Sequence, residues 1–253
     1  MKIGIIGGSG LDNPEIFELQ KEMNVTTPYG EPSSSLKTGL IEGKEVVLLG
    51  RHGREHTIPP AQVNYRANIY ALKEAGCNNI IATTAVGSLR DEIKRGDLVI
   101  IDQFIDFTKQ REMTFHTSFL PHTPVHIPMA NPYNSEIREH LIKNCEKMGY
   151  PFHKKGTVIT IEGPRFSSKA ESNMFRVWGA DIINMSIATE TILANEAGIP
   201  YAAVAMSTDY DCWKEDEEPV TWETILKVFT QNAQRVINLL IKTIMMIHLK
   251  ILT

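Results

Sequence analysis

The sequence has few cysteines, and they form no pattern typical of a disulfide-stabilised or metal-binding protein. Cys77, Cys145 and Cys212 are far apart, three thiols cannot all pair, and no CxxC or Cys/His ligand spacing occurs. Reduced thiols are typical of intracellular compartments. We therefore expect no disulfide framework and no metal site, and we predict a cytoplasmic location.

The charge and hydropathy patterns of nucleic-acid-binding and membrane proteins are also absent. The formal net charge is −4, whereas nucleic-acid modules usually carry a basic stripe. Glycines break the apolar start "MKIGIIGGSG" too early for a signal peptide. Charged residues interrupt the apolar C-terminal run, so no stretch of about 18–20 uncharged apolar residues exists. We expect neither a nucleic-acid nor a membrane partner, and we predict a terminal helix that packs on the body or on another subunit.

Several common catalytic motifs are missing as well. The sequence has no GxSxG, no HExxH and no GxxxxGK[ST]. Its glycine-rich start is not a dinucleotide fingerprint, because the spacing would need a third glycine where Asn13 stands. Serine hydrolysis, zinc hydrolysis and hydride transfer therefore lose support.

What the sequence does contain is an alternation of strand-like and helix-like stretches. Apolar, β-branched runs predict strands at 2–8, 45–50, 79–88, 96–106, 155–163, 180–186 and 201–209. Helical spacing with caps or glycine stops predicts helices at 63–76, 134–149, 186–198 and 221–245. With no repeat or linker between them, these elements predict an α/β fold with helices on both faces of a sheet, in one domain spanning 1–253.

Polar side chains gather directly after the predicted strands, at the sheet edge where open α/β folds bind ligands. They include Ser9; Arg51, His52, Arg54 and His56; Thr83, Thr84 and Ser88; Glu162 and Arg165; and Asp209 and Asp211. Arginine suits bidentate contact with phosphate, and glycine-rich turns can present backbone N–H groups to an anion. The loops that contain Ser9, Arg51 with His52, and Thr83 with Thr84 are therefore candidates for one shared anion site, although each taken alone could be a turn without a ligand.

Two carboxylates close the last buried run, in "AMSTDYDCW". Asp209 and Asp211 stand at i and i+2, so both side chains point to the same side if the strand continues. Burial and a like-charged neighbour both raise the pKa of a carboxyl group. One of the pair is thus expected to be protonated and able to act as an acid.

Read together and in order, the motifs resemble those of the purine nucleoside phosphorylase superfamily, most closely its 5′-methylthioadenosine phosphorylase branch. The motifs are "IGIIGGSGL", "RHGREHTIPP", "ATTAVGSLR", "DQFID", "IEGPRFSS", "INMS" and "TDYDCW". The resemblance implies a three-layer phosphorylase-type fold with a mixed, barrel-like central sheet flanked by helices. It also implies a cytoplasmic transferase of purine and methionine salvage, assembled as a homotrimer or a dimer of trimers, that uses inorganic phosphate as co-substrate and no metal or organic cofactor.

The resemblance also assigns roles to individual residues. Phosphate would be held by Ser9, Arg51, His52, Thr84, Ala85 and Ser186. The nucleoside would be bound by Met185 at the ribose, by Phe166, Asp209 and Asp211 at the purine, and by His56, His126, Trp222 and Ile225 near the 5′-methylthio group. Ser167 is also expected to contact the nucleoside. His56 is expected to reach the site across a subunit interface.

The implied reaction makes Asp209 and Asp211 the candidate catalytic residues. A departing purine needs a proton at N7, and a carboxylate also accepts the N6–H of adenine, whereas a 6-oxopurine suits an amide donor. The expected reaction is the reversible phosphorolysis of methylthioadenosine to adenine and 5-methylthioribose 1-phosphate. Phosphorolysis of a 6-oxopurine nucleoside or of 5′-methylthioinosine is the main alternative; hydrolysis without phosphate and nucleotide binding without turnover are two others.

Overall fold

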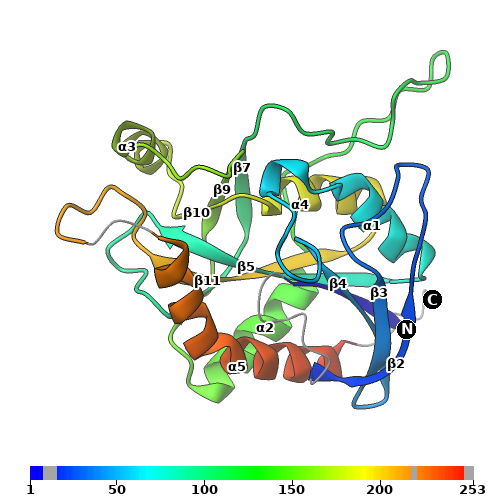
Figure 1. Ribbon diagram of the computed structural model, residues 1–253, viewed down its shortest axis with the longest axis horizontal. Coiled ribbons are helices and arrows are strands. Elements are labelled where there is room, and N and C mark those ends of the chain that lie inside the picture. Colours follow the sequence, from blue (N-terminus) through cyan, green and yellow to red (C-terminus); the bar gives the residue numbers. More distant parts are fainter. Residues whose placement is uncertain (8–15, 218–220, 248–253) are drawn as a thin grey trace.

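The computed structural model describes residues 1–7, 16–217 and 221–247 (Figure 1). Within these residues, eleven strands join in one mixed sheet, whose main path runs β2-β3-β4-β1-β5-β10-β9-β7. The strands are β1 (Lys2–Gly7), β2 (Glu18–Met23), β3 (Leu36–Ile41), β4 (Lys44–Gly50), β5 (Asn79–Ser88), β6 (Leu98–Ile100), β7 (Gln103–Phe107), β8 (Phe152–His153), β9 (Thr157–Ile161), β10 (Ile182–Asn184) and β11 (Tyr201–Asp209).

Strand β5 is the branch point of the sheet. Its partner β11 runs parallel to it along almost its whole length. The opposite edge of β5 is shared: β1 pairs in parallel with residues 79–82, and β10 pairs antiparallel with residues 87–88. Because β1 and β10 diverge between these points, residues 83–86 pair with neither strand on this edge, and they face the gap between β1 and β10.

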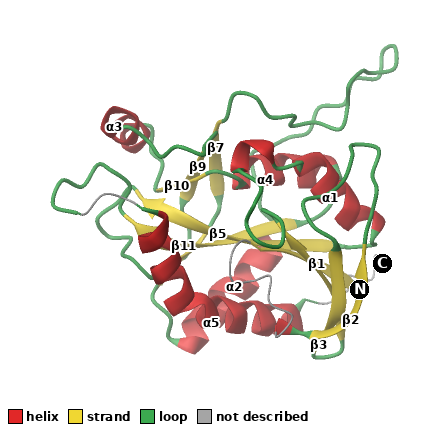
Figure 2. Cartoon of the chain, in the orientation of Figure 1, coloured by secondary structure: helices red, strands yellow, loops and turns green. Residues whose placement is uncertain are grey.

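Helices cover both faces of the sheet, as the strand–helix alternation predicts (Figure 2). They are α1 (Tyr65–Glu74), α2 (Ser135–Met148), α3 (Lys169–Val177), α4 (Ile187–Glu196) and α5 (Trp222–Met246). Helices α1 and α4 pack on one face, and α2 and α5 pack on the other. Helix α3 lies at the edge near β7, β9 and β10, where its Phe175 packs against Ile159 and Ile183. None of the helices within the described residues is long and apolar enough to cross a membrane.

The sequence pattern explains how the two faces are built. Along β11, Ala202 and Val204 join the cluster under α2 and α5, while Tyr201, Ala203 and Ala205 join the cluster under α1 and α4. This is the alternation of a strand that is buried on both faces. Burying apolar side chains on both sides contributes about 25 cal/mol per Å² of buried apolar surface, so the burial of β5 and β11 on both faces stabilises the centre of the sheet.

Most predicted elements are confirmed, and one strand prediction is wrong. The run 96–106 is two strands: β6 pairs with β11 and β8, whereas β7 moves on to pair with β9. The hairpin partners β2 and β3 and the helix α3 were not predicted. Strand β2 is polar and lies at the sheet edge, and α3 begins with the capping box Ser168–Glu171.

Candidate active site

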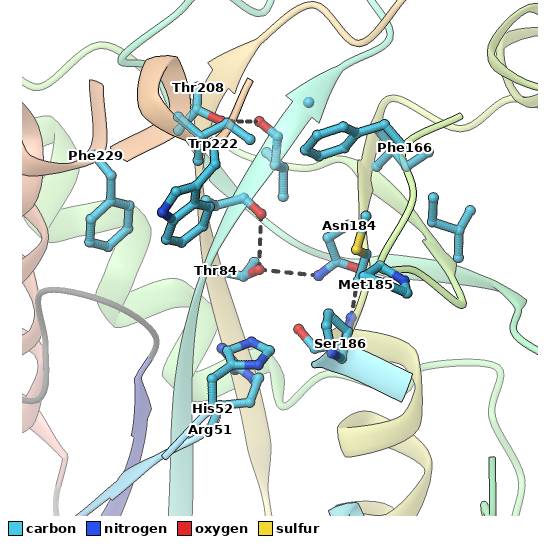
Figure 3. A pocket seen from close by; sticks show the side chains of 18 of the residues that line it. Arg51, His52, Thr84, Phe166, Asn184, Met185, Ser186, Thr208, Trp222 and Phe229 are labelled. Atoms are coloured by element: carbon cyan, nitrogen blue, oxygen red, sulfur yellow. Dashed lines mark hydrogen bonds between the residues drawn. The ribbon is translucent and has the colours of Figure 1, made fainter. Parts of the chain in front are cut away.

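One cavity of about 490 Å³ lies where the carboxyl ends of β4, β5, β10 and β11 meet (Figure 3). This volume is within the usual range for sites that enclose a small organic ligand. The gap between β1 and β10 opens it, since residues 83–86 of β5 form part of its wall. The first turns of α5 and the loop 161–167 close the remaining sides.

The cavity brings together most of the residues singled out in the sequence. Those that line it are Arg51, His52, His56, Thr84, Ala85, Phe166, Ser167, Met185, Ser186, Asp209, Asp211, Trp222 and Ile225. They come from loops far apart in the chain that meet because the strand ends meet. Ser9 lies outside the described residues.

The structure places the two histidines expected near the 5′-methylthio group differently. His126 does not line the cavity of its own chain; it lies on the exposed segment between β7 and α2, where its ring is 5.9 Å from that of Phe119. His56, expected from across a subunit interface, lines the cavity of its own chain. The reason is local: His56 belongs to the turn that follows β4, and its left-handed backbone, with φ of 55°, keeps that turn tight.

Arg51 forms a buried cationic end of the cavity, and only 2% of its surface is exposed. Its Nε and Nη2 donate to the Glu190 carboxylate at 2.5 and 3.0 Å, and its Nη1 donates to the Thr83 carbonyl at 2.9 Å. Burial alone would lower the pKa of Arg51, but the Glu190 carboxylate more than offsets this and raises it. The guanidinium is therefore a permanent, oriented charge.

His52 stands beside Arg51 and is neutral. Burial, helped by the Arg51 charge, lowers the pKa of His52 to about 3. Its Nδ1 lies 2.9 Å from the Ile58 carbonyl oxygen, which can only accept, so the proton of the neutral ring sits on Nδ1. The Nε2 atom of His52 is consequently a hydrogen-bond acceptor in this state.

The start of helix α4 completes this end of the cavity. Ser186 is its N-cap residue, yet the Ser186 side chain forms no capping hydrogen bond with the helix. Asn184 organises the approach: it donates to Thr84 Oγ1 at 3.3 Å and accepts from Thr160 Oγ1 at 2.8 Å. A helix N-terminus favours an anion, so Arg51 and α4 together make a site for a negatively charged group.

The other end of the cavity carries the two carboxyl groups, and their geometry differs from the prediction. Strand β11 ends at Asp209 after a bulge, and Asp211 adopts a left-handed backbone with φ of 51°. The assumption that the strand continues through both is therefore wrong. Asp209 accepts hydrogen bonds at 2.8 Å from Thr208 Oγ1 and from the Asp211 backbone N–H.

Both carboxyl groups are only 6% exposed, and both have raised pKa values. Burial is the main cause for each. The neighbouring Asp209 charge adds to the shift at Asp211, whereas the hydrogen bonds from Thr208 and the Asp211 N–H oppose the shift at Asp209. A raised pKa is what a carboxyl group needs to donate a proton near neutral pH.

An apolar and aromatic wall lies between the two ends. His56 is sandwiched between rings, 4.3 Å from that of His52 and 4.7 Å from that of Trp222. Burial lowers the pKa of His56, so this wall carries no histidine charge at neutral pH. The side chains of Ile225, Leu226 and Phe229 from α5 extend the wall.

Sequence reasoning missed Glu190, Asn184 and Thr208. Glu190 carried a usable signal, since it is a carboxylate in the middle of a helix whose other residues, apart from the terminal Asn195 and Glu196, are mostly apolar or small. A buried charge needs a partner, and the arginines at the strand ends, Arg51, Arg54 and Arg165, were the candidates. Asn184 and Thr208 carried no such signal, because their roles depend on contacts between separate strands.

Comparisons with known proteins identify the family of the chain. A family model described as the phosphorylase superfamily matches residues 2–245. S-methyl-5′-thioadenosine phosphorylase of Xenopus tropicalis is 56% identical over 96% of this chain and 88% of its own length, and that of Danio rerio is 54% identical over the same shares.

Solved structures are similar over nearly the whole chain. A methylthioadenosine phosphorylase from Schistosoma mansoni in complex with adenine has a TM-score of 0.92 and 40% identity, covering 97% of this chain and 91% of that one. A variant from the same organism in complex with methylthioadenosine has a TM-score of 0.91 and 39% identity over the same shares. The family match, these relatives and a shared mixed α/β fold lead to one conclusion: the chain belongs to the phosphorylase superfamily.

Proposed function

We propose that this chain catalyses the reversible phosphorolysis of S-methyl-5′-thioadenosine, giving adenine and 5-methylthioribose 1-phosphate. The observation that carries the proposal is one cavity with an oriented cation at one end and a buried, protonatable carboxyl pair at the other. Figure 3 shows Arg51 and His52 at the first end and Thr208, the hydrogen-bond partner of Asp209, at the second. Relatives named for this activity share about half or more of its sequence.

At the cationic end, phosphate is held by Arg51, Thr84, Ser186 and the amides around Ala85. His52 accepts a hydrogen bond at Nε2 from the P–OH of hydrogen phosphate, since its other nitrogen donates to Ile58. Fixing the nucleophile beneath the sugar raises its effective concentration, which in well-oriented reactions supplies up to about 7–11 kcal/mol. The bound dianion also offsets positive charge on the sugar.

The substrate spans the cavity between the two ends. Met185 lies against the ribose, and Phe166 packs on the purine with Ser167 beside it. The 5′-methylthio group occupies the wall made by His56, Trp222 and Ile225. A thioether suits this wall because neither histidine is charged at neutral pH and sulfur packs favourably against aromatic rings.

In the chemical step the N9–C1′ bond breaks and a phosphate oxygen bonds to C1′. The electron pair of the broken bond passes to the purine, and Asp209 donates its proton to N7 as the purine leaves. The same carboxyl group accepts a hydrogen bond from the N6 amino group, and Asp211 supports it through its backbone N–H. A general acid placed in this way contributes about 10²–10⁴ in rate.

An assay of base release with phosphate varied tests the proposal. We expect adenine from methylthioadenosine only when phosphate is present, with much slower release of hypoxanthine from inosine. Release that does not depend on phosphate would indicate a hydrolase instead. A preference for inosine or methylthioinosine would favour the 6-oxopurine alternative, and binding without turnover would leave a regulatory module.

The proposal includes three properties of the whole enzyme. It acts in the cytoplasm, in purine and methionine salvage; it needs no metal or organic cofactor; and it works as a homotrimer or a dimer of trimers. Unchanged activity after dialysis against a chelator supports the second property. Light scattering coupled to size exclusion tests the third, and a monomeric mass would contradict it.

A further inference from the structure

Three buried polar side chains behind the phosphate end form a connected cluster. Arg51 follows β4, Glu190 lies in α4, and Tyr201 begins β11. The Tyr201 hydroxyl donates to Glu190 Oε2 at 2.8 Å, the same oxygen that accepts from Arg51 Nη2 at 3.0 Å. Each residue is at most 2% exposed. The carboxylate therefore joins a strand-end loop, a helix and a central strand at one point.

The hydrogen bonds of Arg51 leave a defined part of it for a ligand. A guanidinium has five N–H groups, and three of these, on Nε, Nη1 and Nη2, donate to Glu190 and to the Thr83 carbonyl. One N–H on each terminal nitrogen remains. Because Arg51 lines the cavity, these two are the N–H groups that can meet an anion there.

We propose that Glu190, itself held by the Tyr201 hydroxyl, is a positioning residue that fixes the Arg51 guanidinium so that its two remaining N–H groups address phosphate. This inference rests on the proposed function. It has a second consequence: because Glu190 balances the charge of Arg51, phosphate is selected by oriented hydrogen bonds more than by an excess of positive charge.

A role in stability alone would predict a different arrangement. A buried ion pair that only supports folding gains nothing from lying at a cavity wall, and such pairs can often be replaced by apolar residues. Here the guanidinium is held by hydrogen bonds from two directions, since Nε donates to the Glu190 carboxylate and Nη1 donates to a backbone carbonyl of β5. Thr83, which provides that backbone contact, directly precedes the proposed phosphate ligand Thr84.

The test compares Glu190→Gln and Tyr201→Phe with a matched control, Glu196→Gln. Glu196 is on the same helix, and its carboxylate holds Thr114 and Phe115 rather than a cavity residue. We expect Glu190→Gln to lower kcat/KM for phosphate by about 10²-fold, as displacement of a positioned group by 1 Å can do. Tyr201→Phe should lower it by about 10-fold, the effect of losing one hydrogen bond to a charged group.

The distinguishing readout is the split between the two substrates. In both variants the KM for phosphate rises, while the KM for methylthioadenosine and all parameters of Glu196→Gln stay within about 3-fold of the unsubstituted enzyme, since those contacts are untouched. An unchanged or lower KM for phosphate in soluble Glu190→Gln would overturn the inference, because removing the carboxylate would then merely strengthen the positive charge. If Glu190→Gln fails to fold, Tyr201→Phe alone decides.

A failure of the positioning role of Glu190 can be distinguished from a failure of the proposed function. If the unsubstituted enzyme releases adenine without phosphate, the proposed function fails before any variant is measured. If it requires phosphate and the variants show no rise in the KM for phosphate, the proposed function stands and the positioning role of Glu190 is wrong.

Discussion

Replacing Asp209 by asparagine is the sharpest test of how this cavity chooses and cleaves its substrate. The two side chains have nearly the same shape, so the substitution removes a proton and a charge while changing little else. Under the proposed mechanism Asp209 donates to N7 and accepts from the N6 amino group. The introduced amide cannot give up a proton at neutral pH, and its NH₂ group would face the N6 hydrogens.

The structure indicates that the variant will fold. The amide oxygen can take the place of Oδ1 and keep the hydrogen bond from the Asp211 N–H, which is 2.8 Å long. The amide nitrogen can then donate to Thr208 Oγ1, because that hydroxyl can turn to donate to the Val86 carbonyl, 3.2 Å away. With both contacts kept, the free energy of unfolding should change by less than about 1 kcal/mol.

The kinetic effect should be much larger than the effect on stability. Loss of a general acid corresponds to about 10²–10⁴ in rate, or about 3–5 kcal/mol of transition-state stabilisation. We therefore expect kcat/KM for methylthioadenosine to fall by at least about 10²-fold, while the ratio of inosine to adenosine activity rises because an amide donor suits O6.

The assay measures adenine and hypoxanthine release at saturating phosphate, with thermal unfolding of each variant as the control. Full activity of Asp209→Asn on methylthioadenosine would refute the acid assignment. A large loss of thermal stability would refute the hydrogen-bond argument instead, because it would mean that Thr208 cannot adapt. The two failures are thus distinguishable in one set of samples.

Three further predictions follow from the same cavity. In Gly87→Ala the new Cβ would lie 2.8 Å from Asp209 Oδ1 and 3.0 Å from Ile183 Cγ2, so the carboxyl group must move. We expect kcat/KM to fall by about 10²-fold, and an unchanged value would mean that Asp209 tolerates the shift. In Trp222→Ala the ring beside His56 is lost; methylthioadenosine should lose about 10-fold in kcat/KM and adenosine less, whereas equal losses would contradict the proposed 5′ wall. The third prediction concerns the pH dependence of stability. Burial lowers the pKa of His52 to about 3, so between about pH 3 and about pH 6.5 the unfolded chain binds a proton at His52 that the folded chain does not. The contribution of His52 to the free energy of unfolding is therefore complete above about pH 6.5 and is lost as the pH falls, by about 2 kcal/mol at pH 5. Unfolding measurements on His52→Gln should show a correspondingly flatter dependence of this free energy on pH, and an unchanged dependence would contradict the lowered pKa.

The sequence by itself determined the strand-and-helix framework and most of the cavity lining. Runs such as 79–88 and 201–209 are buried on both faces, so their apolar, β-branched pattern predicts strands without knowledge of their partners. Polar residues at strand ends then predict a site, because strand ends in such sheets converge. The identity of one side chain, Asp209 rather than an amide, predicts which purine is read.

Only the tertiary structure decided the features that depend on contacts between distant segments. The cavity opens because β1 and β10 leave the same edge of β5 at different points, and this register is a property of three strands together. The pairing of Arg51 with Glu190 joins residues 139 positions apart. The turn at Asp211 depends on a left-handed backbone, with φ of 51°, that the pattern of residue types does not specify. Hydrophobic periodicity reports which side of an element is buried, but it carries no information about the partner that buries it.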